Sequence, residues 1–367
     1  MASTKEDETA AAVQELGSMS LGTSAERKGE PEVNVNNNED AEENNEAPAK
    51  LCSKCSKKSD ALVKCRDCKC VWYCDKECQN KHWKEHKIEC KPIKKALDKR
   101  GGKLDLGDEL YLGPLPDLPP REECPICMRA LPLDERLQVY SACCGKTLCS
   151  GCEFQHKVQT QKVNDKRAQK KQPPVPRACA FCREPTSKSD EEVLAMKRER
   201  VEHNDPFAMY NLGCKHGLGR LGLPVDQAKC IDLLRQSAGL GCAVAWYTLG
   251  IFHHTGDMGL EQNEEEAVKC WKQAAKGGDT NALHNLGCIA EGNGDFVAAM
   301  CNWRLAASGG DRLPMGALIE CCFEKDLLHH AGLSETLRAM YRARAELKSD
   351  DRDAHIQYLK VTGKYDR

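Results

Sequence analysis

Hydrophobic residues are distributed very unevenly along this chain of 367 residues. The first fifty residues are rich in Glu, Asn, Ala and Ser, and their few aliphatic residues are well separated. Such a segment cannot bury enough apolar surface to offset the entropy that it would lose on ordering. We therefore predict a disordered tail over residues 1–50.

The C-terminal half carries a repeated hydrophobic pattern. The stretches AMYNLG, AVAWYTLG and NALHNLG end at Gly213, Gly250 and Gly287, so they recur every 37 residues. A period of this size with two helical segments per unit indicates an α-solenoid, in preference to an unrelated helical bundle. Ala238 and Ala275 keep the same spacing. We expect these small residues where the two helices of a hairpin approach closely.

This pattern resembles the Sel1-like subfamily of tetratricopeptide-type repeats, and the resemblance covers residues 205–325. The last unit is shorter, because Ala307 follows Ala275 by only 32 residues. The resemblance implies an all-α solenoid. Because each repeat buries its face only against its neighbours, we expect the helical region to fold without the rest of the chain.

Helices are also predicted on both sides of the repeats. Ser189 and Glu192 form a capping-box pattern, which predicts a connecting helix within residues 187–204. Residues 326–367 are expected to form a helical cap that closes the stack.

Cysteine content changes the picture, since the chain has 24 cysteines. The N-terminus has no basic segment followed by an apolar core, so we expect no secretory signal and a cytoplasmic or nuclear location. Thiols stay reduced there, and clustered cysteines bind metal. No apolar run approaches the ~20 residues that a membrane span needs, so no membrane partner is expected.

The cysteines fall into three groups of eight, in residues 52–90, in residues 124–182 and from residue 214 onward. Only the first two groups contain Cys-x-x-Cys pairs. A lone cysteine in a helical pattern usually behaves as a small hydrophobic residue. We therefore assign the third group to the helical core: Cys214, Cys230, Cys242, Cys270, Cys288, Cys301, Cys321 and Cys322.

The first group has the spacing of metal ligands. Cys74 and Cys78 are four residues apart, so they lie on one face of a helical turn. His86 and Cys90 have the same spacing, although His82 lies only one turn earlier. Because zinc takes four tetrahedral S or N ligands, eight ligands make two sites.

The stretch from Tyr73 to Cys90 matches YCxxxCQxxHWxxHxxxC, and residues 51–91 resemble the MYND zinc finger. The family spacing selects His86 over His82 and leaves Cys70 unused. The resemblance implies two interleaved zinc sites, one with Cys52, Cys55, Cys74 and Cys78 and the other with Cys65, Cys68, His86 and Cys90.

The MYND resemblance also implies recognition of proline-containing peptide segments of partner proteins. Gln79 and Trp83 are the expected contact residues, with packing of Trp83 into the small finger core as an equal alternative. Ten basic and six acidic residues lie in 52–90. With seven thiolates and two Zn²⁺ the net charge is about +1, so the lysines mostly neutralise the metal sites and a nucleic-acid partner is disfavoured.

Residues 123–186 resemble a RING finger through CPIC, CGKTLCSGC and CAFCREP. Lys146 stands where the typical pattern has a histidine, and a protonated lysine cannot bind zinc. Interleaving gives a complete first site from Cys124, Cys127, Cys149 and Cys152, and a second site from Cys144, Cys179 and Cys182 with Cys143 as the candidate fourth ligand.

A RING finger implies recruitment of a ubiquitin-conjugating enzyme, a partner that Ile126 and Arg183 would contact. Ala180 stands where a proline is common, which weakens this prediction. The basic insert between Cys152 and Cys179 is predicted to be a solvated, partly disordered loop, with a nuclear-localisation signal as the alternative.

Residues 92–122 form a predicted linker that begins basic and ends rich in proline. Pro116 to Pro120 read PDLPP, the Pro-x-Leu-x-Pro form that the MYND resemblance associates with bound peptides. The segment would either fold back onto the finger or stiffen the approach to Cys124, and the second alternative is favoured.

The sequence therefore predicts a multidomain protein, with two small zinc-stabilised fingers (MYND and RING-like), an all-α Sel1-like solenoid and about four Zn²⁺ ions. No catalytic constellation is evident. The predicted function is a protein-interaction scaffold, with a RING-type E3 ubiquitin ligase as the alternative. MYND fingers also occur in SET methyltransferases, but no part of the chain resembles a SET domain.

Overall fold

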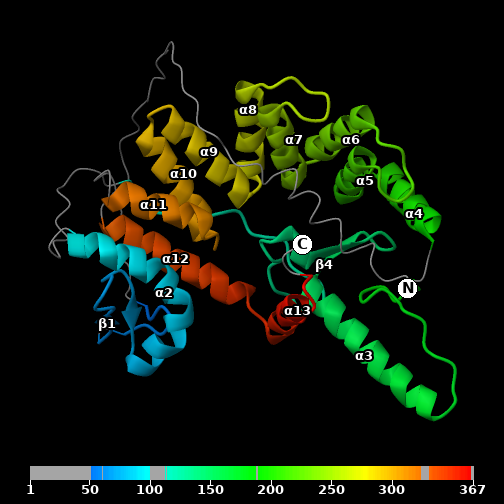
Figure 1. Cartoon of the computed structure of the whole chain (residues 1–367), viewed down its shortest axis with the longest axis horizontal. Helices are drawn as coiled ribbons and strands as arrows, with labels where there is room; N and C mark the ends of the chain where they lie inside the picture. The colour runs from blue at the N-terminus through cyan, green and yellow to red at the C-terminus, as the bar shows by residue number, and fades with distance from the viewer. Residues whose placement is uncertain are drawn as a thin grey trace, which may run out of the picture.

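The computed structural model describes residues 51–59, 61–99, 112, 114–186, 189–323 and 330–364. The predicted tail and the middle of the predicted linker lie outside these residues. The stacked helices form an arch, with the two cysteine-rich regions and the last two helices beneath it (Figure 1). None of the described helices has the length and apolar character needed to cross a membrane.

Helical hairpins build the arch, and short polar side chains start most of their helices. Asp205, Asp226 and Asp279 each accept a hydrogen bond from the backbone amide three residues on, which satisfies a free donor of the first turn. The capping box at Ser189 and Glu192 is confirmed. The helices are α4 (Asp190–Glu202), α5 (Pro206–Leu218), α6 (Gln227–Gly239), α7 (Ala243–Thr255), α8 (Glu264–Lys276), α9 (Thr280–Gly292) and α10 (Phe296–Ser308).

The repeated glycines lie where the two helices of a hairpin cross. A Cβ added at Gly250 would lie less than 3.0 Å from the ring of Trp271, and one at Gly287 would meet Trp303 in the same way. Both tryptophans are 1% exposed. Each indole Nε1 donates to a carbonyl of the preceding helix at 3.3 Å. Gly250 and Gly287 therefore make room for a buried tryptophan, whereas a Cβ at Gly213 would meet Cys230 and Leu233 of the next helix.

Three further helices follow the repeats: α11 (Leu313–Phe323), α12 (His330–Leu347) and α13 (Asp350–Val361). Helix α12 packs against α10 and α11 and so extends the stack. Helix α13 instead packs against α3 (Ser150–Gln169) of the second cysteine-rich region. Only part of the predicted C-terminal cap therefore lies on the solenoid.

The first cysteine-rich region consists of a short hairpin and a long helix. Strands β1 (Val63–Lys64) and β2 (Trp72–Tyr73) are antiparallel, and α2 (Lys76–Lys99) follows them. The structure differs from the sequence prediction at residues 92–99, which were expected to be linker and are helical. Pro92 costs α2 a hydrogen bond, but the next turns bury Ile93 and Leu97 in a core shared with α10 to α12.

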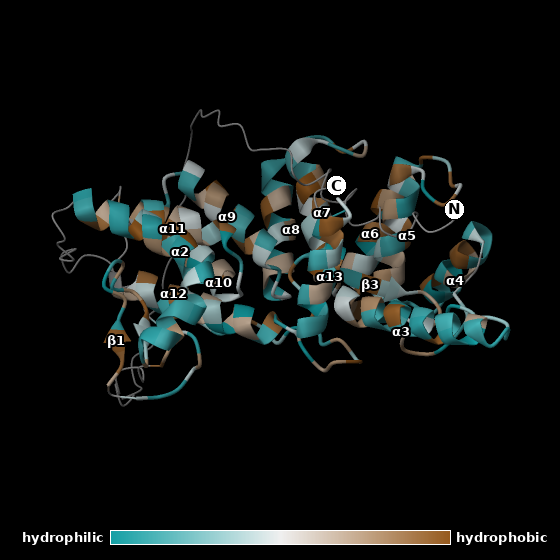
Figure 2. Ribbon diagram, turned by 60° about the horizontal axis from the view of Figure 1, so that its bottom comes forward, coloured by the Kyte–Doolittle hydropathy of each residue, from teal (hydrophilic) through white to brown (hydrophobic). Residues whose placement is uncertain are grey.

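The second region contains η1 (Glu135–Leu137), the antiparallel strands β3 (Gln138–Ser141) and β4 (Lys146–Cys149), and α3. Residues 153–169 of the insert predicted to be a loop are helical, which corrects that prediction. The insert has no Pro or Gly before Pro173, so nothing in it stops the helix. Hydrophilic residues dominate α3, in contrast to α7 of the stack (Figure 2).

The proline-rich segment lies against the solenoid. Leu118 contacts the turn at Gly309, and Pro119 lies beside Gly278. The alternative in which PDLPP folds back onto the first finger is therefore wrong in this structure, because the leucine and the proline have a different partner.

Candidate metal centres

The structure brings together four groups of four potential metal ligands. Within each group the ligand atoms all lie within 4.8 Å of one another, which fits tetrahedral zinc coordination. Every cysteine side chain that the structure describes is a free thiol. The groups are Cys52, Cys55, Cys74 and Cys78; Cys65, Cys68, His86 and Cys90; Cys124, Cys127, Cys149 and Cys152; and Cys143, Cys144, Cys179 and Cys182.

The first group joins a backbone turn to the start of α2. The amide of Ser56 donates to the carbonyl of Cys52 at 2.9 Å, which closes the Cys-x-x-Cys turn. Asp75 accepts from the amide of Cys78 at 2.7 Å and so caps the helix that carries the second pair. The sulfur atoms of Cys55 and Cys74 are 3.4 Å apart as a result.

The second group is completely buried. His86 Nε2 lies 3.4 Å from Cys68 Sγ, so this nitrogen faces the thiols. The other ring nitrogen, Nδ1, lies 3.0 Å from the hydroxyl of Tyr341, which in turn donates to Glu89 at 2.8 Å. A metal on Nε2 leaves the proton on Nδ1, and the hydroxyl then orients the imidazole as an outer-shell acceptor.

His82 lies outside both groups. It is 2% exposed, and its Nδ1 lies 3.0 Å from the hydroxyl of Tyr73. Burial lowers the pKa of His82 to about 4, so the ring is neutral at pH 7. Its role is to pack the finger, and Cys70, which donates to the carbonyl of Cys68, is likewise outside the groups.

The two predicted peptide-contact residues have different surroundings. Trp83 on α2 is 39% exposed, and its ring meets that of buried His86 edge to face. The Nε2 of Gln79 points to Cys65 Sγ at 3.9 Å, so this side chain lies next to the buried metal group. Of the two, Trp83 has the surface that a partner can contact.

The third group is held by an arginine from the C-terminus. Arg352 on α13 is 5% exposed and donates to Cys127 Sγ at 3.7 Å and to the carbonyl of Leu347 at 2.7 Å. Four thiolates around Zn²⁺ carry a net charge of −2, which a buried guanidinium partly neutralises. Sequence reasoning missed Arg352 and Tyr341, because neither belongs to a motif near the cysteines.

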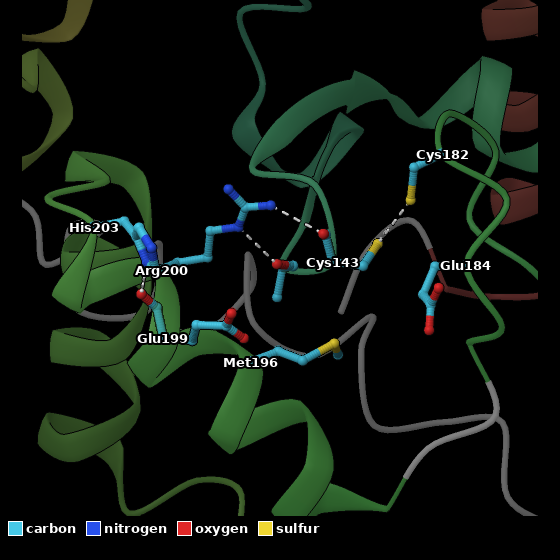
Figure 3. A pocket seen from close by; sticks show the side chains of 8 residues that line it. Cys143, Cys182, Glu184, Met196, Glu199, Arg200 and His203 are labelled. Carbon is cyan, nitrogen blue, oxygen red and sulfur yellow. Dashed lines mark hydrogen bonds between the residues drawn. The ribbon is translucent and has the colours of Figure 1, made fainter.

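The fourth group contains the adjacent pair Cys143 and Cys144. Both lie in the tight turn between β3 and β4, where Gly145 has a φ of 67°. Arg200 on α4 donates to the carbonyls of Ala142 and Cys143 at 3.2 and 2.9 Å (Figure 3). The conformation of this turn places both thiols in the same ligand group. Lys146 is exposed and does not belong to the group.

A hollow of about 470 Å³ lies beside the fourth group, between the β3–β4 turn and α4. Its lining includes Cys143, Cys182 and Arg200. In Figure 3 the guanidinium of Arg200 points to the turn. Helix α4, which connects the second cysteine-rich region to the solenoid, thus supports this ligand group.

The two residues predicted to contact a conjugating enzyme are accessible. Ile126 is 41% exposed within the first Cys-x-x-Cys turn, and Arg183 is exposed just after the last one. Phe181 adds a further side chain with 42% exposure. Apolar side chains therefore project from two metal-ligand turns of this region.

Comparison with known families identifies part of the chain. Residues 52–90 match the model of the MYND finger, and residues 206–242 and 243–279 each match the Sel1 repeat. The chain therefore contains a MYND finger and two Sel1 repeats, and its cysteine clusters fit zinc binding.

Curated relatives match over a short region only. The human N-lysine methyltransferase SMYD2 is 43% identical over 42 residues, which is 11% of this chain and 10% of that protein. SET domain-containing protein 14 of Caenorhabditis elegans is 46% identical over 43 residues, 12% of this chain and 10% of that protein. The chain thus spans about a tenth of the length of these relatives.

Solved structures also match. A protective antigen of uropathogenic Escherichia coli with an SLR fold is 25% identical, over 47% of this chain and 37% of that one, with a TM-score of 0.36. A Sel1 repeat protein from Oxalobacter formigenes is 24% identical, over 46% and 66%, with a TM-score of 0.36.

Proposed function

We propose that this protein is a zinc-dependent scaffold, in which the MYND finger and the helical repeats bind peptide segments of partner proteins. The observation that carries the proposal is the exposed Trp83 on a finger that shares an apolar core with the solenoid. Sixteen clustered thiol and imidazole ligands require a reducing compartment, so we place the protein in the cytoplasm or nucleus.

The anchoring gives the finger a fixed orientation. Its buried side chains belong to the same apolar core as Leu333, Leu337 and Met340 of α12. Trp83 lies outside this core, and a large aromatic side chain in such a position is typical of a binding hot spot. Extended proline-containing segments suit it, because they are preorganised and lose little entropy on binding.

The test is the affinity of a Pro-x-Leu-x-Pro peptide for Trp83→Ala. We expect at least a tenfold loss, with zinc content unchanged because Trp83 is not a ligand. Ile88→Ala is the matched control, since Ile88 is 51% exposed on the same helix. Equal affinity of the wild type and Trp83→Ala would contradict peptide binding at this residue.

A RING-type E3 ubiquitin ligase is the second candidate, favoured by the exposure of Ile126 and Arg183. We infer a RING-like finger from the interleaved order of the third and fourth ligand groups. In an in vitro ubiquitination assay with a panel of conjugating enzymes, Ile126→Ala is expected to abolish any turnover. Val163→Ala on α3 is the control. A wild type that is inactive with every conjugating enzyme would contradict the ligase candidate and leave the scaffold as the proposed function.

A further inference from the structure

Glycine turns recur along one edge of the solenoid. Each lies between the second helix of one hairpin and the first helix of the next. Gly241, Gly278 and Gly310 have φ values of 89°, 83° and 101°, which favour glycine. Without side chains, these turns leave room for another segment to approach the main chain closely.

The proline-rich segment occupies two of these turns. Pro119 lies 3.6–3.7 Å from the position that a Cβ at Gly278 would take. Leu118 Cδ1 lies 3.0 Å from the equivalent position at Gly309, and Arg121 donates a hydrogen bond to the carbonyl of Gly309. The chain just before the second finger runs beneath the stack at this point (Figure 1).

The contacts define a short recognition pattern. Pro116 and Asp117 are exposed, whereas Leu118 and Arg121 are half-buried. Burial lowers the pKa of Arg121, and its guanidinium donates to the main-chain carbonyl of Gly309. Residues 118–121 thus contact the solenoid through an apolar side chain (Leu118), a proline (Pro119) and an arginine that donates to a main-chain carbonyl (Arg121).

The equivalent turn one hairpin earlier is uncovered. Within the described residues, no atom beyond the local backbone lies within 4 Å of a Cβ built at Gly239 or Gly241. The segment therefore does not seal the whole edge, and a longer peptide has room to continue along it.

We propose that this glycine edge is a binding site for extended Leu-Pro-x-Arg segments of partner proteins, and that residues 118–121 occupy it in cis until a partner displaces them. The proposal rests on the scaffold function and names a class of partner for the solenoid. The tether gives residues 118–121 an effective concentration of about 1 mM at this site. If the site has a Kd of ~0.1 mM, this competition would lower the apparent affinity of an external peptide about tenfold.

The experiment uses the full chain and a fluorescent peptide with the sequence PLPDLPPREE of residues 114–123. Leu118→Ala with Arg121→Ala should bind this peptide about tenfold more tightly than the wild type. Asp117→Ala is the control, because that side chain is exposed in the same segment. We call the double variant Leu118→Ala with Arg121→Ala the opened variant. The same peptide with its arginine replaced by alanine should bind the opened variant more weakly than the unchanged peptide does.

The peptide also contains the Pro-x-Leu-x-Pro form, so each chain is repeated with Trp83→Ala. A gain that persists without Trp83 supports the glycine edge. A gain that disappears with Trp83 overturns the inference, because the finger then takes the peptide. No gain in a variant that keeps its helical melt also overturns it, and residues 118–121 are then a structural strap. If the double variant does not fold, Arg121→Gln replaces it.

These outcomes separate the two proposals. Binding that needs Trp83 and ignores Leu118 and Arg121 retains peptide recognition by the finger while the solenoid inference fails. Binding that does not depend on Trp83 and is tighter in the opened variant supports the solenoid inference, while peptide recognition by the finger fails.

Discussion

At the scale of single residues, one hydroxyl joins the first finger to the solenoid. Tyr341 on α12 lies between His86 and Glu89, and Glu89 also pairs with Arg312 at 2.8 Å. Burial raises the pKa of Tyr341, so the hydroxyl stays protonated and donates. A potential metal ligand is thus oriented by a residue 255 positions away.

Tyr341→Phe tests this link. The change keeps the ring and removes the group that fixes His86, so zinc affinity of the second group should fall by about 10–100-fold. Competition with a zinc chelator measures the fall. Tyr358→Phe is the matched control, since Tyr358 is 45% exposed on α13. Unchanged affinity in Tyr341→Phe would mean that the hydroxyl does not support the site.

Substitution of the two histidines of the finger should affect zinc content differently. The purified chain is expected to hold about four zinc ions, and His86→Ala should lose one of them. His82→Ala should keep all of them and lose stability, since it empties a buried position next to Tyr73. Elemental analysis gives the counts. Loss of zinc in His82→Ala alone would reverse the assignment.

At the scale of elements, the crossing of helices in each hairpin depends on glycine. Gly287→Ala should lower the free energy of unfolding by about 1–3 kcal/mol, because the new methyl group would overlap the buried Trp303. Gly292→Ala is the control on the same helix, where a Cβ meets no atom within 4 Å. It should be neutral or stabilising by up to about 1 kcal/mol, as measured by denaturant unfolding.

Elements with local signals could be predicted from the sequence, and elements set by distant partners could not. The capping box at Ser189 and the glycine period depend on neighbours within one hairpin. The continuation of α2 through Pro92 depends on a core with α11 and α12, which no local pattern reveals. Likewise Cys143 could be named as a ligand from its motif, but the arginine that holds its turn comes from α4.

At the scale of the whole molecule, both cysteine-rich regions are fastened to the C-terminal helices. Ser334 on α12 donates to the carbonyl of Cys70, and Lys348 pairs with Glu85. On α13, His355 contacts Ser150 of the second region, next to Arg352. Helix α13 therefore depends on the second cysteine-rich region, whereas α12 is shared between the first region and α10 and α11. This bears on the expectation that the helical region folds alone.

Removal of zinc should expose this dependence. Thiolate ligands make the local fold depend on metal, so a chelator should unfold both cysteine-rich regions. Helix α13 would then lose α3, the helix that it packs against, while α12 keeps its contacts with α10 and α11. Helices α6 to α8 keep a core of their own around Trp271. Hydrogen exchange should show lost protection in α13 and retained protection in α6 to α8. Full protection of α13 after chelation would mean that this helix folds without the second cysteine-rich region.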